Sequence, residues 1–263
     1  MNEAIAVLVR RHDPDRFLTA LFAPPVRRDP LLTLYAFNHE LARAREVASE
    51  PPLALIRLQW WREVVEGETK RHEVASPLSQ AIAAGALDPA HLLPIIEARE
   101  SEAYADFETL ADWRAWLLAG AGGLAVAAAA ALGAPDPEAM RPFGAAYGVA
   151  GLSRATGVLA ARGICLLPRD LLDGHGLSPE EFIDNPGSAP ARAAQHEIVR
   201  EGKVFLADAG RVRVPRVAVA AALPAVLARR DLARWPTVFT PRRLGDRLAV
   251  TFAGMTGRIL PRS

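Results

Sequence analysis

The sequence predicts an all-α protein, and three observations support this. Apolar residues recur at spacings of three and four along most of the chain, the period of a helix that buries one face. No stretch alternates apolar and polar residues as a half-buried strand does. Six capping residues stand directly before proline, which loses no hydrogen bond at the start of a helix. These pairs are Asp29-Pro30, Ser76-Pro77, Asp88-Pro89, Asp136-Pro137, Ser178-Pro179 and Thr240-Pro241.

The composition is that of a globular protein with a large core. The chain has 263 residues, of which 51% are hydrophobic. Its net charge of +1 gives no electrostatic reason to bind nucleic acid. Cys165 is the only cysteine, which excludes an internal disulfide and a multi-cysteine zinc site and suits a reducing compartment. We therefore expect a single domain over residues 1–263, in the cytoplasm, with no nucleic-acid partner.

The periodicity between these helix starts predicts the individual helices. Gly67, Gly85, Gly133 and Gly174 lie where helices could end, and Pro224 should kink or split its helix. One longer loop is expected, roughly at 162–189. The predicted helices are 3–11, 15–22, 30–48, 52–66, 77–84, 89–110, 113–132, 137–160, 190–210, 215–229 and 241–258.

The uncharged stretch Ala115–Ala134 is about long enough to span a bilayer. It consists mostly of alanine and glycine, which transfer into lipid only weakly. Gly120, Gly122 and Gly123 would also loosen a helix. We therefore expect a buried helix whose small residues let its neighbours pack closely, and no transmembrane span.

The helix expected at 30–48 carries a stripe that is apolar at its start and polar at its end. Such a stripe can line the mouth of a cavity. Alternatively, the last turns of the helix simply emerge into solvent, and the pattern alone favours this second interpretation. In the next helix, Leu53, Ile56, Trp60 and Val64 are expected to face inward. The stripe of the first helix consists of Leu31, Leu34, Tyr35, Asn38, Leu41, Ala42, Arg45 and Glu46.

Seven segments, taken in order, resemble the squalene/phytoene synthase family over roughly residues 15–255. Each segment is weak alone, and their order and spacing carry the resemblance. The resemblance implies a single helical bundle with a central cavity, similar to that of isoprenoid synthases. The segments are Leu34–Phe37, Leu58–Glu63, Ala119–Leu124, Tyr147–Leu152, Leu166–Leu172, His175–Leu177 and Leu223–Leu227.

The resemblance also implies a chemistry that this chain is poorly equipped to perform. Members of the family condense two prenyl diphosphates head to head, with magnesium held by two aspartate-rich helical motifs. At the first motif this chain has Ala42, Arg43 and Glu46, so only one carboxylate remains. At the second it has the neutral residues Ala155–Leu159, and no Asp or Glu occurs from Met140 to Arg169. The chain thus most resembles the catalytically degenerate branch that includes the mitochondrial assembly factor for respiratory complex I and its bacterial relatives.

We therefore expect a protein without condensing activity, with no catalytic residue, no metal ligand and no cofactor. It would act as an isoprenoid- or lipid-binding module or in protein assembly. The alternative is an active prenyltransferase that uses magnesium with acids of the helix at 89–110, although a solvated face explains these acids more simply. A purely structural protein with a filled core is a third possibility. The acids are Glu97, Glu100, Glu102, Asp106 and Glu108.

Arginines could bind a diphosphate or a phospholipid headgroup directly, because a guanidinium matches phosphate oxygens in pairs. Arg43, Arg45, Arg154 and Arg162 are the candidates, and ordinary surface arginines are the simpler interpretation. The expected partners are an isoprenoid or lipid, a protein in respiratory complex assembly, and the surface of the inner membrane as a peripheral contact. The expected substrate-binding residues are Tyr35, Asn38, His39, Arg43, Arg45, Glu46 and Arg154.

Overall fold

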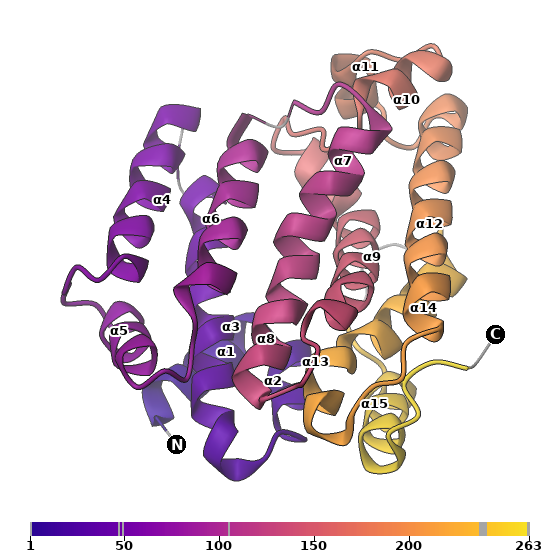
Figure 1. Cartoon of the computed structure of the whole chain (residues 1–263). Helices are drawn as coiled ribbons and strands as arrows, with labels where there is room; N and C mark the ends of the chain where they lie inside the picture. Colours follow the sequence, from indigo (N-terminus) through magenta and orange to yellow (C-terminus); the bar gives the residue numbers. More distant parts are fainter. Residues whose placement is uncertain (1, 47, 49, 105, 237–240, 262–263) are drawn as a thin grey trace.

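A computed structural model describes residues 2–46, 48, 50–104, 106–236 and 241–261, and over these residues the protein consists of helices with no strand (Figure 1). The predicted all-α fold is confirmed. The helices are α1 (Glu3–His12), α2 (Pro14–Ala20), α3 (Pro25–Glu46), α4 (Pro51–Val65), α5 (Ala75–Ala83), α6 (Pro89–Tyr104), α7 (Leu110–Leu117), the π-helical turn η1 (Leu118–Gly122), α8 (Gly123–Leu132), the 3₁₀ turn η2 (Glu138–Met140), α9 (Arg141–Ala160), α10 (Arg169–Gly174), α11 (Pro179–Asp184), α12 (Ala189–Gly210), the 3₁₀ turn η3 (Arg216–Ala218), α13 (Val219–Ala222), α14 (Pro224–Arg234) and α15 (Leu244–Thr256).

Helix α3 runs through the middle of the bundle. All residues from Leu31 to Asn38 are buried, so the helix is enclosed on every side over these two turns. It packs against α1, α4, α5 and α8. Helix α8 is almost as enclosed and packs against α3, α6 and α9. As a result α3 and α9 lie on either side of α8, with little direct packing between them (Figure 1).

Two of the predicted helix starts are confirmed by capping hydrogen bonds. Asp88 accepts a hydrogen bond from the amide of Ala90 at 2.9 Å, directly before α6. Ser178 accepts one from the amide of Glu181 at 3.2 Å, and Glu181 returns the interaction to complete a capping box on α11. A side-chain acceptor before proline therefore marks these helix starts as expected.

Three other starts are displaced, and the start at Thr240 lies outside the described residues. Helix α3 begins at Pro25 and contains Pro30, so Asp29-Pro30 is not a helix start. The buried run that follows Pro30 stabilises α3 enough to offset the hydrogen bond that proline cannot make. Ser76-Pro77 lies one residue inside α5, and Asp136-Pro137 precedes the short turn η2 rather than α9.

The segment at 162–189 was expected as a loop but contains the short helices α10 and α11. Each has only six residues, too few for a helical period to stand out in the sequence. Pro224 does split its helix, since α13 ends at Ala222 and α14 begins at the proline. Gly67, Gly85 and Gly133 end helices with φ of 113°, 66° and 82°, whereas at α10 the positive φ falls on Gly176 instead of Gly174.

The inward face of α4 differs from the prediction. Leu53 and Ile56 are 46% and 66% exposed, whereas Trp61 is 4% exposed and Trp60 is only partly buried. Of the predicted inward residues, Val64 is buried as expected. The other buried residues of α4 are Ala54, Leu58, Trp61 and Val65. Two adjacent tryptophans point about 100° apart, so the apolar pattern alone fits either register.

The stretch from Leu110 to Leu132 is the one helix among the described residues that is long and apolar enough to cross a membrane, and 61% of its most apolar window is buried inside the protein. The glycines permit this close packing at a π-helical turn, where Arg141 donates a hydrogen bond to the carbonyl of Leu118 at 2.8 Å. These contacts are those of the buried helix that the sequence predicted.

Candidate functional site

Arg16 of α2 links the turn of α3 that carries Tyr35 to α9, the helix that carries Arg154. The guanidinium of Arg16, on α2, lies 5.7 Å from the ring centre of Tyr35 on α3 and 4.8 Å from that of Tyr147 on α9. Arg16 thus bridges the two helices, and Asp13 balances its charge at 2.8 Å. Beyond this bridge, Gly151 is exposed, and a side chain there would meet no atom within 4 Å. We define the inter-helix site as Tyr35, Asn38, Arg45, Arg99, Glu102 and Arg154, together with Gly151.

Next to the bridge, a chain of ion pairs joins four segments of the protein. Arg242 binds Asp15 of α2 at 2.6 Å and Asp231 of α14 at 2.7 Å. Arg154 of α9 lies 3.4 Å from Asp231 and 4.0 Å from Asp15. The hydroxyl of Tyr147 donates to Asp15 at 3.0 Å. We call Asp15, Tyr147, Arg154, Asp231 and Arg242 the arginine–aspartate network.

The network lies in a largely desolvated place. The side chains of Arg242, Asp15 and Asp231 are 12%, 14% and 10% exposed. Burial raises the pKa of Tyr147 well above its usual value, and the nearby Asp15 adds to this effect. Burial alone would lower the pKa of Arg242, but its hydrogen bonds to Asp15 and Asp231 outweigh that effect and raise it. The phenol of Tyr147 therefore stays neutral.

Two arginines, one on α3 and one on α6, share one carboxylate. Arg99 binds Glu102 at 2.6 Å, and Arg45 lies 3.9 Å from the same side chain. Arg99 also donates a hydrogen bond to the side-chain oxygen of Asn38 at 3.4 Å. Burial lowers the pKa of Arg45, and the neighbouring Arg99 lowers it further. This cluster has one positive charge in excess, so an anion is the ligand that suits it.

His39 and Arg43 point away from the inter-helix site. The ring of His39 stacks on His12 of α1, with ring centres 4.4 Å apart. Burial and the neighbouring His12 lower the pKa of His39, which favours a neutral, structural histidine. Arg43 pairs with Glu40 at 3.1 Å and lines a separate groove of about 440 Å³ against α4. Glu46 is exposed at the end of α3.

The acids near the site do not form a set of metal ligands. Among the described residues, no three His, Cys, Asp or Glu side chains come together in a way that would hold a metal ion. Glu100 instead binds Arg62 at 3.0 Å, and Glu102 binds Arg99. Magnesium requires several oxygen ligands, and here Glu100 and Glu102 already face guanidinium groups. The donor set therefore does not fit a magnesium cluster, and whether the protein uses a metal in solution stays a prediction.

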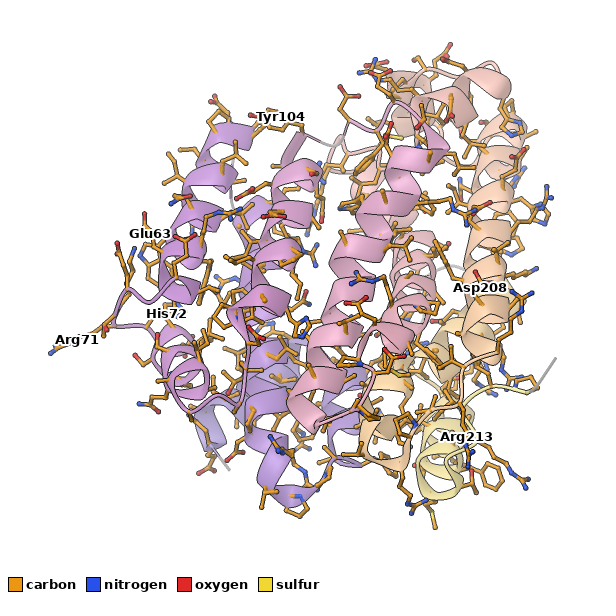
Figure 2. The ribbon with its side chains drawn as sticks, viewed as in Figure 1. Glu63, Arg71, His72, Tyr104, Asp208 and Arg213 are labelled. Atoms are coloured by element: carbon orange, nitrogen blue, oxygen red, sulfur yellow. The ribbon has the colours of Figure 1, made fainter. Side chains whose placement is uncertain are left out.

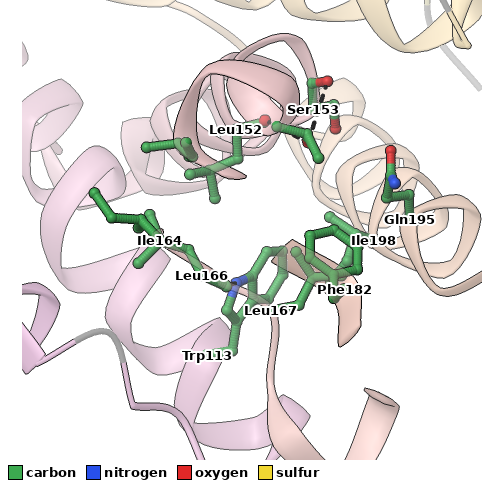
Figure 3. A pocket seen from close by; sticks show the side chains of 11 residues that line it. Trp113, Leu152, Ser153, Ile164, Leu166, Leu167, Phe182, Gln195 and Ile198 are labelled. Atoms are coloured by element: carbon green, nitrogen blue, oxygen red, sulfur yellow. Dashed lines mark hydrogen bonds between the residues drawn. The ribbon is translucent and has the colours of Figure 1, made fainter. Parts of the chain in front are cut away.

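A second cavity lies behind α9 and is apolar. Figure 3 shows Leu152, Ile164, Phe182 and Trp113 around it. The indole nitrogen of Trp113 donates to the carbonyl of Leu166 at 2.9 Å and fixes one wall. Its volume is about 20 Å³, roughly the space of one water molecule, so it is closed to a larger ligand in this conformation.

Sequence reasoning missed four of the side chains that shape the site: Asp15, Arg16, Arg99 and Arg242. Arg242 and Asp15 are 227 positions apart, and Asn38 and Arg99 are 61 apart. No short motif joins them, so no local signal was available for Asp15 or Arg242. For Arg99, the only indication of a role in the site was its position in the sequence beside the acids of the helix predicted at 89–110.

The comparisons with known proteins agree with this fold. The model of the squalene/phytoene synthase family matches residues 9–236. A dehydrosqualene synthase structure superposes with a TM-score of 0.80 at 12% identity, covering 97% of this chain and 95% of that chain. The squalene synthase HpnC from Alicyclobacillus acidocaldarius gives 0.74 at 20% identity, covering 88% and 91%. At these identities the structural likeness concerns the fold alone.

The chain is also similar to proteins named NADH dehydrogenase (ubiquinone) complex I, assembly factor 6. It is 28% identical to the Homo sapiens protein over 213 residues, or 77% of this chain, and 29% identical to the Rattus norvegicus protein over 232 residues, or 83% of this chain. It spans 63% of the length of the human protein and 69% of the rat protein. With the family model matched over most of its length, this chain belongs to the squalene/phytoene synthase family.

Proposed function

We propose that this protein is a family member that does not condense prenyl diphosphates and instead binds an anionic isoprenoid or lipid through arginines. One observation carries the proposal: guanidinium groups surround the place where the family resemblance requires metal-binding carboxylates. Arg45 and Arg99 share Glu102, while Arg154 and Arg242 surround Asp15 and Asp231. Arginines can neutralise a diphosphate at rest, but they do not replace magnesium as a Lewis acid that drives its departure.

The excess charge on α3 and α6 supports the ligand class. Arg45 and Arg99 are 18% and 25% exposed, so an anion between them would lose much of its water and be bound more strongly than at the surface. A phosphate group is suited to such a pair because each guanidinium can offer two parallel N–H donors. A diphosphate and a phospholipid headgroup share this chemistry, and the choice between them is an experimental question.

In a magnesium-containing assay with farnesyl diphosphate, we expect no release of pyrophosphate above the protein-free rate and no coupled product. The reason is the donor set, since too few carboxylates are available to hold the metal against the leaving group. A colorimetric pyrophosphate assay with product chromatography measures both, and an active squalene synthase serves as positive control. Release that depends on magnesium and on this protein would favour the alternative of an active prenyltransferase.

Substitution of Arg45 by glutamine should weaken binding of farnesyl diphosphate about tenfold or more, because it removes a charged hydrogen-bond donor worth about 1.5–3 kcal/mol. The thermal shift on adding the ligand without magnesium measures the change. Arg43→Gln is the matched control, because Arg43 is on the same helix but faces the α4 groove. Equal losses in both variants would contradict the assignment of the ligand to the inter-helix site.

A role in assembling a respiratory complex is the second part of the proposal. It rests on the similarity to proteins named complex I assembly factor 6, over a chain that covers less than two thirds of the human protein. A cytoplasmic location with peripheral contact to the inner membrane is proposed on the same basis. Co-purification of complex I subunits with the tagged protein from its own host would support this role, and its absence would leave lipid binding as the function.

A further inference from the structure

The C-terminal helix α15 presents a row of large apolar side chains to solvent. Leu244, Leu248, Phe252 and Met255 are 72%, 58%, 63% and 68% exposed. At 100° per residue they fall within an arc of about 80° along one side of the helix. A globular protein rarely leaves such a continuous row uncovered without an interaction that uses it.

The opposite side of α15 is firmly attached to the bundle. Val250 and Ala253 are buried, and a side chain in place of the hydrogen of Gly254 would meet the ring of Phe22. Asp246 binds Arg230 at 2.6 Å and Arg234 at 2.9 Å. Burial alone would raise the pKa of Asp246, but these hydrogen bonds lower it to about 2. The row is therefore held outward by a rigid helix.

Positive charge is concentrated around the same helix. From Arg211 to Arg258 the sequence has ten arginines and two acids, Asp231 and Asp246, a net charge of +8. The whole chain carries +1, so all the remaining residues together carry −7. Both acids of the segment are paired with arginines inside the protein. The exposed charge of this region is therefore almost entirely positive.

A groove of about 1340 Å³ adjoins the apolar row and continues this pattern. Its lining includes Phe252 of the row and five arginines, and no acidic residue. Figure 2 shows one of these arginines, Arg213, beside α15, with Tyr104 at the opposite corner of the molecule. The five arginines are Arg211, Arg213, Arg216, Arg229 and Arg258.

We propose that this face of α15 and the adjoining arginines dock onto a membrane that contains anionic phospholipid. An apolar row flanked by arginines matches the boundary between acyl chains and headgroups, where the row enters the hydrocarbon edge and the guanidinium groups meet phosphates. A second copy of the chain would have to face the same concentration of positive charge, so it fits less well. The proposal does not depend on what the inter-helix site binds.

The test is co-sedimentation of the full chain with vesicles. We expect binding to vesicles of equal parts phosphatidylglycerol and phosphatidylcholine, weak binding to phosphatidylcholine alone, and release at high salt. Phe252→Glu combined with Met255→Glu should lower the bound fraction roughly tenfold, since it puts charge at the hydrocarbon edge. Arg213→Gln combined with Arg258→Gln should lower it several-fold and reduce its dependence on salt.

Tyr104→Glu is the matched control, because Tyr104 is 60% exposed but lies far from α15 (Figure 2). This variant should bind vesicles as the unmodified chain does. Circular dichroism checks that every variant is folded. Equal binding to neutral and anionic vesicles, no binding to either, or unchanged binding by the Phe252→Glu and Met255→Glu variant would overturn the proposal. A dimer in light scattering that this variant abolishes would also overturn it and assign the face to a second copy.

Discussion

Replacing Arg242 by methionine is expected to lower the free energy of unfolding by about 3 kcal/mol or more. Arg242 makes closer ion pairs than Arg154 does to both Asp15 and Asp231, and Arg242 and the two acids are mostly buried. Its loss leaves Arg154 as the cation beside Asp231 at 3.4 Å and beside Asp15 at 4.0 Å, and Asp15 keeps the hydrogen bond from Tyr147. Removing one partner of a buried ion pair typically costs about 3–5 kcal/mol, because the charge left behind is poorly solvated.

Denaturant titration measures this loss, and a fall of roughly 10 °C in melting temperature should accompany it. Arg211→Met is the matched control, since Arg211 is 72% exposed and its ion pair with Asp208, three residues earlier, lies at the surface. Adding Asp231→Asn to Arg242→Met should recover part of the stability, because it removes one of the two carboxylates that have lost an arginine partner. A loss below about 1 kcal/mol in the single variant would show that the network does not hold these segments together.

The second large effect is expected from Gly144→Ala, although alanine is the better helix former. Gly144 of α9 crosses the π-helical turn η1, and an added methyl group would overlap the carbonyl oxygen of Ala121 and lie 2.7 Å from the Cβ of Ala125. Both obstacles are backbone or directly attached to it, so neither can rotate away. We expect a loss of about 3 kcal/mol in the free energy of unfolding.

Gly151→Ala, seven residues along the same helix, provides the comparison. No atom lies within 4 Å of the position that its methyl group would take. The helical preference of alanine over glycine should then dominate and raise the free energy of unfolding by up to about 1 kcal/mol. Opposite signs for these two substitutions, measured by denaturant titration, are the expected result. A Gly144→Ala variant as stable as the unmodified chain would mean that α9 and η1 do not approach this closely.

The elements that the sequence predicted well are those with a strong local cause. Asp88 and Ser178 mark helix starts because a side-chain acceptor and a proline act within one turn. Pro224 splits its helix for an equally local reason. The helix start predicted at Pro30 was wrong. The residues that follow Pro30 are buried against α1, α4 and α8, and a local sequence pattern contains no information about these distant helices. Tertiary packing decided the outcome there.

The structure places the predicted site residues in different surroundings. Arg45 lies beside Glu102 and Asn38 beside Arg99 of α6, and Arg154 lies beside Asp15 and Asp231. His39 and Arg43 face other elements. Tyr35, Asn38 and Arg45 share one side of α3, as the helical period predicted, whereas Arg154 is on α9. The partners Arg99 and Arg242 came from distant segments, so only the fold reveals that the charges of the site are balanced by arginine. Whether any of these residues binds a substrate stays a prediction.

The most direct test of this account is calorimetric titration with farnesyl thiodiphosphate, a poorly hydrolysed analogue, with magnesium and then with EDTA. If arginines hold the anion, the affinity should agree within about twofold in the two buffers and fall at least tenfold when Arg45 and Arg99 are both replaced by glutamine. Binding that disappears in EDTA and survives the double substitution would contradict the account and point to a metal held by carboxylates.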